Sequence, residues 1–172
     1  MQNPHIPAMH FNTRYICTTQ NWFGGGMDVT PSIKDANEKN KFHKTLKIMC
    51  DRHNKKFYKK YKKWCDEYFY LPHRNESRGI GGIFFDYKKE NFEKDFNFVR
   101  DVGVTFQMLF NKIIEKKIKK KWTLKDKETQ YIKRGRYAEF NLLYDRGTKF
   151  GLQTGGNVEG ILMSLPPIAK WK

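Results

Sequence analysis

Hydrophobic and polar residues alternate with two different periods along the chain, and each period predicts one kind of element. His10, Asn12 and Arg14 alternate with their neighbours at period 2, which predicts a strand that presents these three side chains on one face. A run rich in glycine, isoleucine and phenylalanine at 78–86 predicts a second, buried strand. Apolar residues at helical spacing predict helices over residues 36–48, 57–71 and 92–113.

The last third of the chain combines both periods. A charged helix is predicted from about Leu124 to near Gly135, followed by a strand over 138–144, where alternate residues are apolar. A further β-like run over 158–165 ends at two prolines. Because strands and helices do not follow a regular βαβ order, we expect one α+β domain over 1–172, with a large, mainly antiparallel sheet flanked by helices on both sides.

A glycine-rich segment surrounds one acidic residue. Three glycines at 24–26 precede Asp28, and Thr30 and Pro31 follow it. Glycine lets the backbone approach a ligand closely and proline fixes φ, so the segment predicts a loop that holds a catalytic carboxylate in place. In the alternative interpretation, the glycines form a hairpin turn and Asp28 only caps the helix that follows.

The predicted face of His10, Asn12 and Arg14 suits an anion. Imidazole can donate a proton, the amide can donate and accept hydrogen bonds, and the guanidinium can bind a carboxylate in bidentate fashion. The alternative is a solvated strand face with an ordinary surface arginine. The nearby Asp28 favours a functional site.

The composition also favours an anionic partner. The chain has 34 Lys and Arg against 18 Asp and Glu, and this net charge of +16 would attract polyanions. The densest lysine cluster, within 112–121, lies at the end of a predicted helix, where cations complement the helix dipole. Since the aromatic residues follow core-helix spacing rather than forming an exposed row beside the cations, a nucleic-acid-binding module is the weaker alternative.

The cysteines and the hydropathy indicate a compartment. Cys17, Cys50 and Cys65 are widely spaced, which favours reduced, packing cysteines in a cytosol over a disulfide framework or a zinc site. The sequence has no run of about 18 apolar residues and no secretory signal pattern. We therefore expect a cytoplasmic protein without a membrane span.

Several longer motifs occur together and in a fixed order. They are HFNTRY at 10–15, WFGGGMDVTP at 22–31, KWCDEYFY at 63–70, HRNE at 73–76, RGIGG at 78–82, RGRYAEFN at 134–141 and FGLQTGG at 150–156. In this combination the chain resembles the oxygen-dependent coproporphyrinogen III oxidases over essentially all of its 172 residues. Chains of that family are longer, so the resemblance implies a fragment truncated at both ends.

The resemblance implies a reaction in haem biosynthesis: O2-dependent oxidative decarboxylation of two propionates of coproporphyrinogen III to vinyl groups, giving protoporphyrinogen IX. It implies that His10 donates a proton and that Asp28, exposed to the macrocycle, accepts hydrogen bonds from pyrrole N–H groups. Arg14 would bind a propionate and Asn12 would orient it. Neither a flavin nor a metal is required for the carbon chemistry, since the electron-rich pyrrole itself reduces O2.

Further site residues follow from the resemblance alone. A substrate-binding role is implied for Gly155, Gly156 and Asn157, although some members have arginine where this chain has Asn157. A divalent metal is an optional cofactor, with His10, His43 and His73 as its implied ligands. In the competing interpretation, such helical or helix-end histidines only pack or cap, because no carboxylate or cysteine stands at ligand spacing from them.

The resemblance also implies an assembly. Members of the family form homodimers, and the region 139–172 is implied in the contact. A second class of function therefore stays open: the chain is an inactive or dimerising fragment that folds without turnover.

Overall fold

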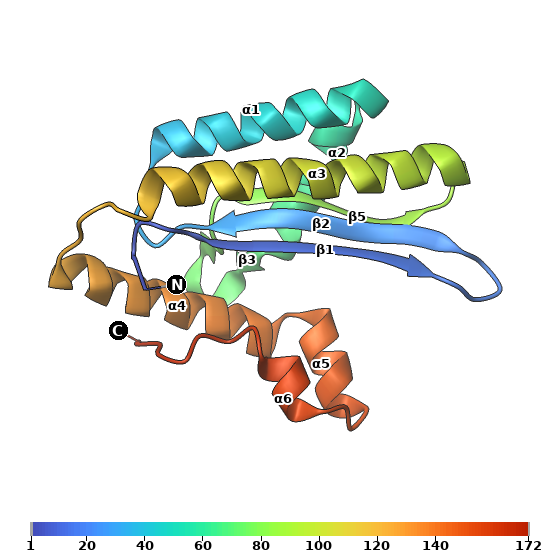
Figure 1. Cartoon of the computed structure of the whole chain (residues 1–172). Coiled ribbons are helices and arrows are strands. Elements are labelled where there is room, and N and C mark those ends of the chain that lie inside the picture. Colours follow the sequence, from blue (N-terminus) through green and yellow to red (C-terminus); the bar gives the residue numbers. More distant parts are fainter. Residues whose placement is uncertain (1, 172) are drawn as a thin grey trace.

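The computed structural model describes residues 2–171, which form a three-stranded antiparallel sheet with helices on both faces (Figure 1). This confirms the predicted α+β class. The strands, in sheet order, are β1 (Ala8–Ile16), β2 (Trp22–Thr30) and β5 (Gly81–Lys88). A small antiparallel pair flanks the 3₁₀-helix η1 (Pro72–Arg74) and consists of β3 (Tyr70–Leu71) and β4 (Glu76–Ser77). The strands predicted around residues 10–14 and 78–86 are therefore confirmed.

Six α-helices complete the described part of the fold. They are α1 (Ala36–His53), α2 (Phe57–Tyr68), α3 (Phe92–Lys117), α4 (Leu124–Leu143), α5 (Arg146–Gln153) and α6 (Val158–Leu162). The first three confirm the helices predicted from apolar spacing. Short polar side chains accept hydrogen bonds from first-turn N–H groups, which explains where five of these helices begin, α6 with Asn157 among them. The other four caps are Asp35 for α1, Asn91 for α3, Thr123 for α4 and Asp145 for α5.

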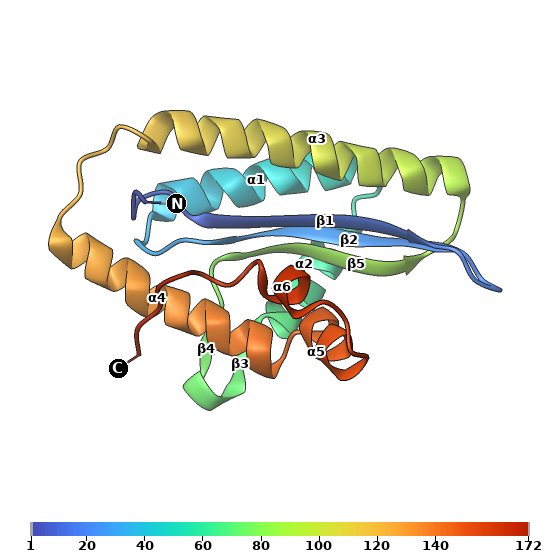
Figure 2. The ribbon, with the colours of Figure 1, turned by 60° about the horizontal axis from the view of Figure 1, so that its bottom comes forward.

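The helices form two layers around the sheet. α1 and α3 cover one face, and α4, α5 and α6 lie across the other face (Figure 2). The main core lies between the sheet and helices α1 to α3, and its most deeply buried side chains include Met27, Phe42, Leu46, Phe85 and Phe98. A smaller cluster joins the end of α2 to α4 and consists of Cys65, Phe69, Leu71 and Phe140.

The predictions for the last third of the chain are wrong in three respects. Helix α4 passes through Gly135 and ends at Leu143, so 138–144 is not a separate strand. The run at 158–165 begins with the short helix α6 and contains no strand. The sheet is therefore smaller than expected. The alternation at 138–144 misled because the buried residues of α4 mix polar and apolar types, from Gln130 and Asn141 to Ala138 and Phe140, and this mixture hides the helical period.

The glycine segment is not a loop. Gly24 and Asp28 both lie inside β2, and Asp35 rather than Asp28 caps α1. A Cβ atom at Gly24 would lie 2.5 Å from Asp86 Oδ1 and 2.7 Å from Arg14 Nε. Glycine is thus required here because side chains of the two neighbouring strands meet across β2.

The cysteines are all unpaired, as expected. Cys50 and Cys65 are buried within helices, and Cys17 is exposed. Burial raises the pKa of the Cys50 thiol to about 12, so it is an inert packing residue. Within residues 2–171, no helix combines the length and the apolar character needed to cross a membrane.

Candidate functional site

The polar face predicted for β1 is present and forms a row of contacts. Asn12 Nδ2 lies 3.5 Å from His10 Nε2, and Arg14 Nη1 donates to Asn12 Oδ1 at 3.2 Å. Arg14 Nη2 also pairs with Asp86 Oδ2 of β5 at 2.8 Å. The structure therefore brings together the three residues that the period-2 pattern selected, and Asp86 fixes the direction of the guanidinium.

Asp28 lies opposite His10 in the β1–β2 register and is only 3% exposed. His10 Nδ1 is 3.0 Å from Asp28 Oδ1, and Arg78 Nη2 donates to Asp28 Oδ2 at 2.6 Å. Burial alone would raise the pKa of Asp28, but the charge of Arg78 and the contact with His10 outweigh it and hold the pKa below its usual value. Asp28 is therefore an ionised, enclosed carboxylate, and the expected exposure to a ligand is wrong.

Arg78 is the site residue that the sequence reasoning did not single out. It is 4% exposed, and its guanidinium carbon lies 3.9 Å from the ring centroid of Phe69, 4.7 Å from that of Phe140 and 4.8 Å from that of Tyr137. A buried guanidinium surrounded by rings and paired with a carboxylate is a fixed positive charge. The available signal was an arginine as the first residue of the glycine-rich run 78–86.

Two adjoining cavities lie along the polar face of β1, and together we call them the cleft. A cavity of about 430 Å³ is lined on the sheet side by Asn12 and Arg14, and by Arg146 at the start of α5. A cavity of about 400 Å³ is lined by Thr30 and by Arg134. Both cavities share the lining residues His10, Tyr137 and Ser164.

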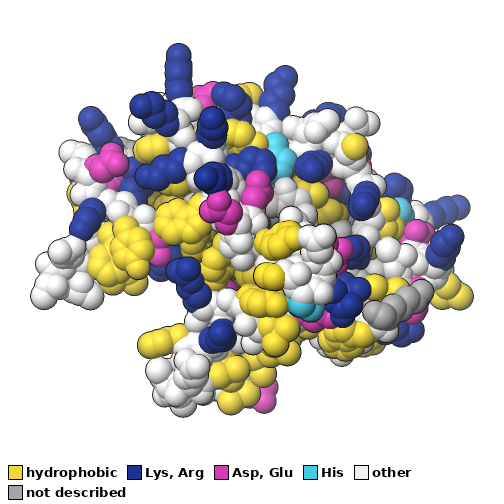
Figure 3. Space-filling model, turned by 180° about the vertical axis from the view of Figure 1, so that it is seen from behind, with side chains coloured by type: hydrophobic (Ala, Val, Ile, Leu, Met, Phe, Trp, Pro, Cys, Tyr) yellow, Lys and Arg dark blue, Asp and Glu magenta, His cyan; other side chains and the backbone are white. Residues whose placement is uncertain are grey.

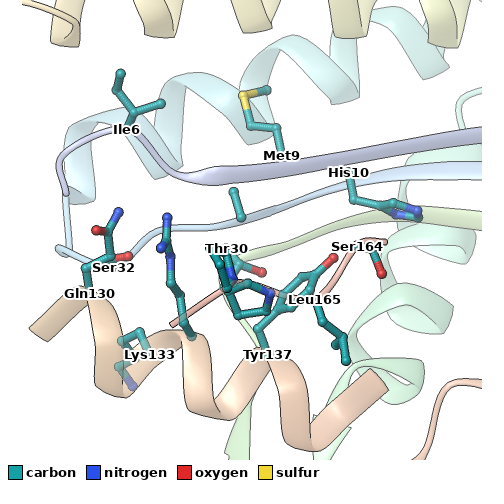
Figure 4. A pocket seen from close by; sticks show the side chains of 14 residues that line it. Ile6, Met9, His10, Thr30, Ser32, Gln130, Lys133, Tyr137, Ser164 and Leu165 are labelled. Atoms are coloured by element: carbon teal, nitrogen blue, oxygen red, sulfur yellow. The ribbon is translucent and has the colours of Figure 1, made fainter. Parts of the chain in front are cut away.

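The walls of the cleft come from different elements. Helix α4 contributes the cleft-lining residues Gln130, Arg134, Tyr137 and Asn141, whose spacing of four, three and four residues places them on one helix face. Figure 4 shows His10 on the sheet side, Tyr137 on α4, and Ser164 and Leu165 of the C-terminal segment beside them. Strand β1 and helix α4 thus oppose each other across the cleft.

The histidines implied as metal ligands have separate partners. His43 Nε2 contacts the carbonyl oxygen of Ile80 at 2.8 Å, and burial lowers the pKa of this histidine. His73 contacts the Tyr144 hydroxyl at 2.8 Å and Glu139 at 3.0 Å, whereas His10 contacts Asp28. Within residues 2–171, no group of three or more His, Cys, Asp or Glu residues is arranged to hold a metal ion. The residues present do not fit the implied metal site.

The implied glycine segment lies away from the cleft lining. Gly155, Gly156 and Asn157 form the connection between α5 and α6, and Asn157 caps α6 by accepting a hydrogen bond from the N–H of Glu159. None of these three residues lines either cavity of the cleft. Their substrate-binding role stays a prediction.

Comparison with known proteins places the whole chain in one family. The family model for coproporphyrinogen III oxidase matches residues 1–172. The curated oxygen-dependent coproporphyrinogen-III oxidases of Rickettsia bellii (strain OSU 85-389), Rickettsia akari (strain Hartford) and Rickettsia rickettsii (strain Sheila Smith) are each 58% identical to it over 172 residues. Each comparison covers 99% of this chain and 62% of the relative. The chain belongs to the coproporphyrinogen III oxidase family.

Proposed function

We propose that the chain carries the oxygen-dependent oxidative decarboxylation of two propionates of coproporphyrinogen III, giving protoporphyrinogen IX. In each step one propionic acid side chain and one O2 give a vinyl group, CO2 and H2O2, so O2 is the oxidant and co-substrate. The observation that carries the proposal is the buried Asp28 carboxylate held between His10 and Arg78, beside a cleft with arginines on both walls. The names of the relatives support the same reaction.

The charges of the cleft match the substrate. Coproporphyrinogen III has four carboxylates, and Arg14 and Arg146 line one cavity of the cleft while Arg134 lines the other. Charge-assisted hydrogen bonds from such guanidinium groups are the strongest available to a carboxylate. The macrocycle would therefore lie across His10 and Tyr137, which line both cavities.

Asp28 acts through His10 in this proposal. Its carboxylate accepts from Nδ1–H of the imidazole, which leaves Nε2 on the side of Asn12 to accept or donate a proton. The earlier expectation that Asp28 contacts the pyrrole N–H groups directly does not fit a carboxylate that is only 3% exposed and lies between His10 and Arg78. Asp28 is therefore proposed as a positioning residue, and His10 as the residue that moves the proton.

The test uses two forms of the protein because the chain spans 62% of the length of the curated relatives it matches. The chain, and the chain extended by the flanking segments of the Rickettsia bellii relative, are incubated with coproporphyrinogen III in air. Product is followed by porphyrin fluorescence after oxidation, with an anaerobic reaction and a His10→Gln variant as controls. If the protein with His10 forms product no faster than its His10→Gln variant in both forms, the proposal is wrong.

We also propose that the chain forms a homodimer through the region 139–172. Large apolar side chains of this region are more than half exposed: Leu143, Phe150, Val158 and Met163. Figure 3 shows hydrophobic side chains gathered on the lower part of the molecule in that view. We expect Phe150→Asp with Met163→Asp to convert a dimer into a monomer in sedimentation equilibrium. A wild-type chain that stays monomeric at high concentration would contradict this, and a dimer without turnover would favour the inactive, dimerising alternative.

The substrate also accounts for the charge of the chain. A net charge of +16 can attract a tetracarboxylate, so no nucleic acid is included in the proposal. Retention of nucleic acid by the purified chain through a high-salt wash would contradict this. The three unpaired cysteines favour a cytoplasmic location, which we include in the proposal.

A further inference from the structure

A third cavity, of about 260 Å³, adjoins the cleft. We call it the Thr30 pocket, and most of its lining residues are polar or charged: Thr30, Ser32, Lys34, Glu76, Ser77, Arg78, Lys133 and Arg136. Thr30, Ser32 and Lys133 also line the 400 Å³ cavity of the cleft, so the two spaces meet at these residues. The Thr30 pocket is too small for a tetrapyrrole, because sites for ligands of drug size begin at about 300 Å³.

Two buried polar atoms of the lining residues have no hydrogen-bond partner within residues 2–171: Thr30 Oγ1 and Arg78 Nε. Thr30 is 8% exposed. Gly79 adopts φ +79°, and a Cβ atom there would lie 2.7 Å from Thr30 Oγ1, so glycine is needed to leave room beside this buried hydroxyl. A buried donor without a partner is costly unless a ligand or an ordered water takes its hydrogen bond.

The charges of the pocket select the sign of such a ligand. Lys34, Arg78, Lys133 and Arg136 line it, with Glu76 as the acidic residue among its lining side chains. Glu76 pairs with Arg136 at 3.0 Å and only loosely with Lys133, at 3.4 Å, while Arg78 pairs with Asp28. The lining is therefore cationic overall and contains hydroxyl donors, which is the combination that oxyanions require.

We propose that the Thr30 pocket binds a small oxyanion, with Thr30 and Lys133 as its principal donors. The ligand is a carboxylate or an inorganic oxyanion, and it has two sources: a propionate of a substrate lying in the cleft, or a free ion such as phosphate. Either one would share the Arg78 guanidinium with Asp28. Binding of a free ion does not require turnover, so this proposal can fail while the proposed decarboxylation stands, and the reverse.

The experiment titrates the purified chain with inorganic phosphate by calorimetry, at constant ionic strength. We expect saturable binding that is about tenfold weaker in Thr30→Val and in Lys133→Met, as expected when one hydrogen bond to a charged ligand is lost. Lys125→Met is the matched control, because Lys125 is an exposed cation of the same helix outside the pocket. It should bind phosphate like the wild type.

Thermal unfolding separates a ligand site from a structural hydroxyl. Without phosphate, Thr30→Val should be at least as stable as the wild type, because the change removes a buried hydroxyl that has no partner. If phosphate binding is absent, or falls equally in Lys125→Met, or if Thr30→Val is clearly less stable, the proposal is wrong. Lys133 is 38% exposed, so Lys133→Met keeps the test valid even if Thr30→Val does not fold.

Anaerobic addition of coproporphyrinogen III then identifies the source of the oxyanion. Displacement of phosphate indicates that a propionate of the substrate occupies the Thr30 pocket, and simultaneous binding indicates a free oxyanion.

Discussion

Asp28 and Arg78 form a buried ion pair whose contributions to stability and to catalysis can be separated. Both side chains are 3% exposed, and they meet at 2.6 Å. Removing one partner of such a pair leaves an uncompensated charge inside the protein, whereas replacing both by groups of similar volume is often close to neutral. The aromatic surroundings of Arg78 suit an apolar replacement.

We therefore expect Asp28→Asn to lower the free energy of unfolding by about 3 kcal/mol or more. It should also lower kcat by roughly 10² to 10³, the effect of losing one preorganised electrostatic group. The double variant Asp28→Asn with Arg78→Met should regain most of the stability but none of the turnover. Urea unfolding and product fluorescence measure the two quantities, and a double variant with restored turnover would exclude Asp28 from the reaction.

Arg14 permits a second test at the same scale. We expect Arg14→Ala to weaken anaerobic binding of coproporphyrinogen III by about 1.5 to 3 kcal/mol, because a charge-assisted hydrogen bond to a propionate is lost. Asp86→Asn is the control, since it removes the protein partner of Arg14 and keeps the guanidinium. Equal affinity of Arg14→Ala and wild type would remove Arg14 from the carboxylate-binding role.

At the scale of elements, α4 is joined to η1 through Glu139. Its carboxylate accepts hydrogen bonds from Arg74 Nη2 at 2.6 Å and Nε at 3.1 Å, and it also contacts His73. These contacts, with the Arg74 hydrogen bonds as the largest influence, lower the pKa of Glu139 to about 2, against an ordinary value of 4.5. A lowered pKa in the folded state means that the folded state favours the charged carboxylate.

The stability from Glu139 should therefore be complete above about pH 4.5 and disappear as the pH falls towards 2. We expect Glu139→Gln to unfold at a lower temperature than the wild type near pH 6, and to show a flatter pH dependence between 4.5 and 2. A series of thermal unfolding curves at stepped pH measures both. Parallel curves for the two proteins would contradict the assigned role.

The elements also show what the sequence alone could and could not predict. The face of β1 was predictable because period 2 is visible in the residue types His10, Asn12 and Arg14 themselves. Helix α4 was not fully predictable, because its buried stripe includes Gln130 and Asn141. These two polar residues line the cleft, so the hydropathy pattern fails at the candidate site. Arg78 was missed because its role depends on partners 50 and 63 residues away.

At the scale of the whole molecule, the layer of α4 to α6 is the less protected one. In α5 and α6 only Thr148 is buried, whereas all of β2 after Trp22 is buried. We expect amide hydrogens of 146–162 to exchange much faster than those of β2, and coproporphyrinogen III to slow exchange around Arg146 by bridging the two walls of the cleft. Hydrogen exchange with mass spectrometry tests this. Exchange that is unchanged by the ligand would place its binding site elsewhere.

Gly135, near the middle of α4, is the position where the last segment of the chain packs against this helix. A Cβ atom at Gly135 would collide with the carbonyl oxygen of Lys170, whose N–H donates to the carbonyl oxygen of Tyr131 at 3.0 Å. Alanine at an ordinary helix position is stabilising relative to glycine by roughly 1 kcal/mol, but here the added methyl group would lift the last segment off the helix. That segment also contributes Pro166 and Pro167 to the wall of the 400 Å³ cavity. The change Gly135→Ala, which helix propensity alone would favour, would thus detach one wall of the cleft from α4 while leaving the core intact.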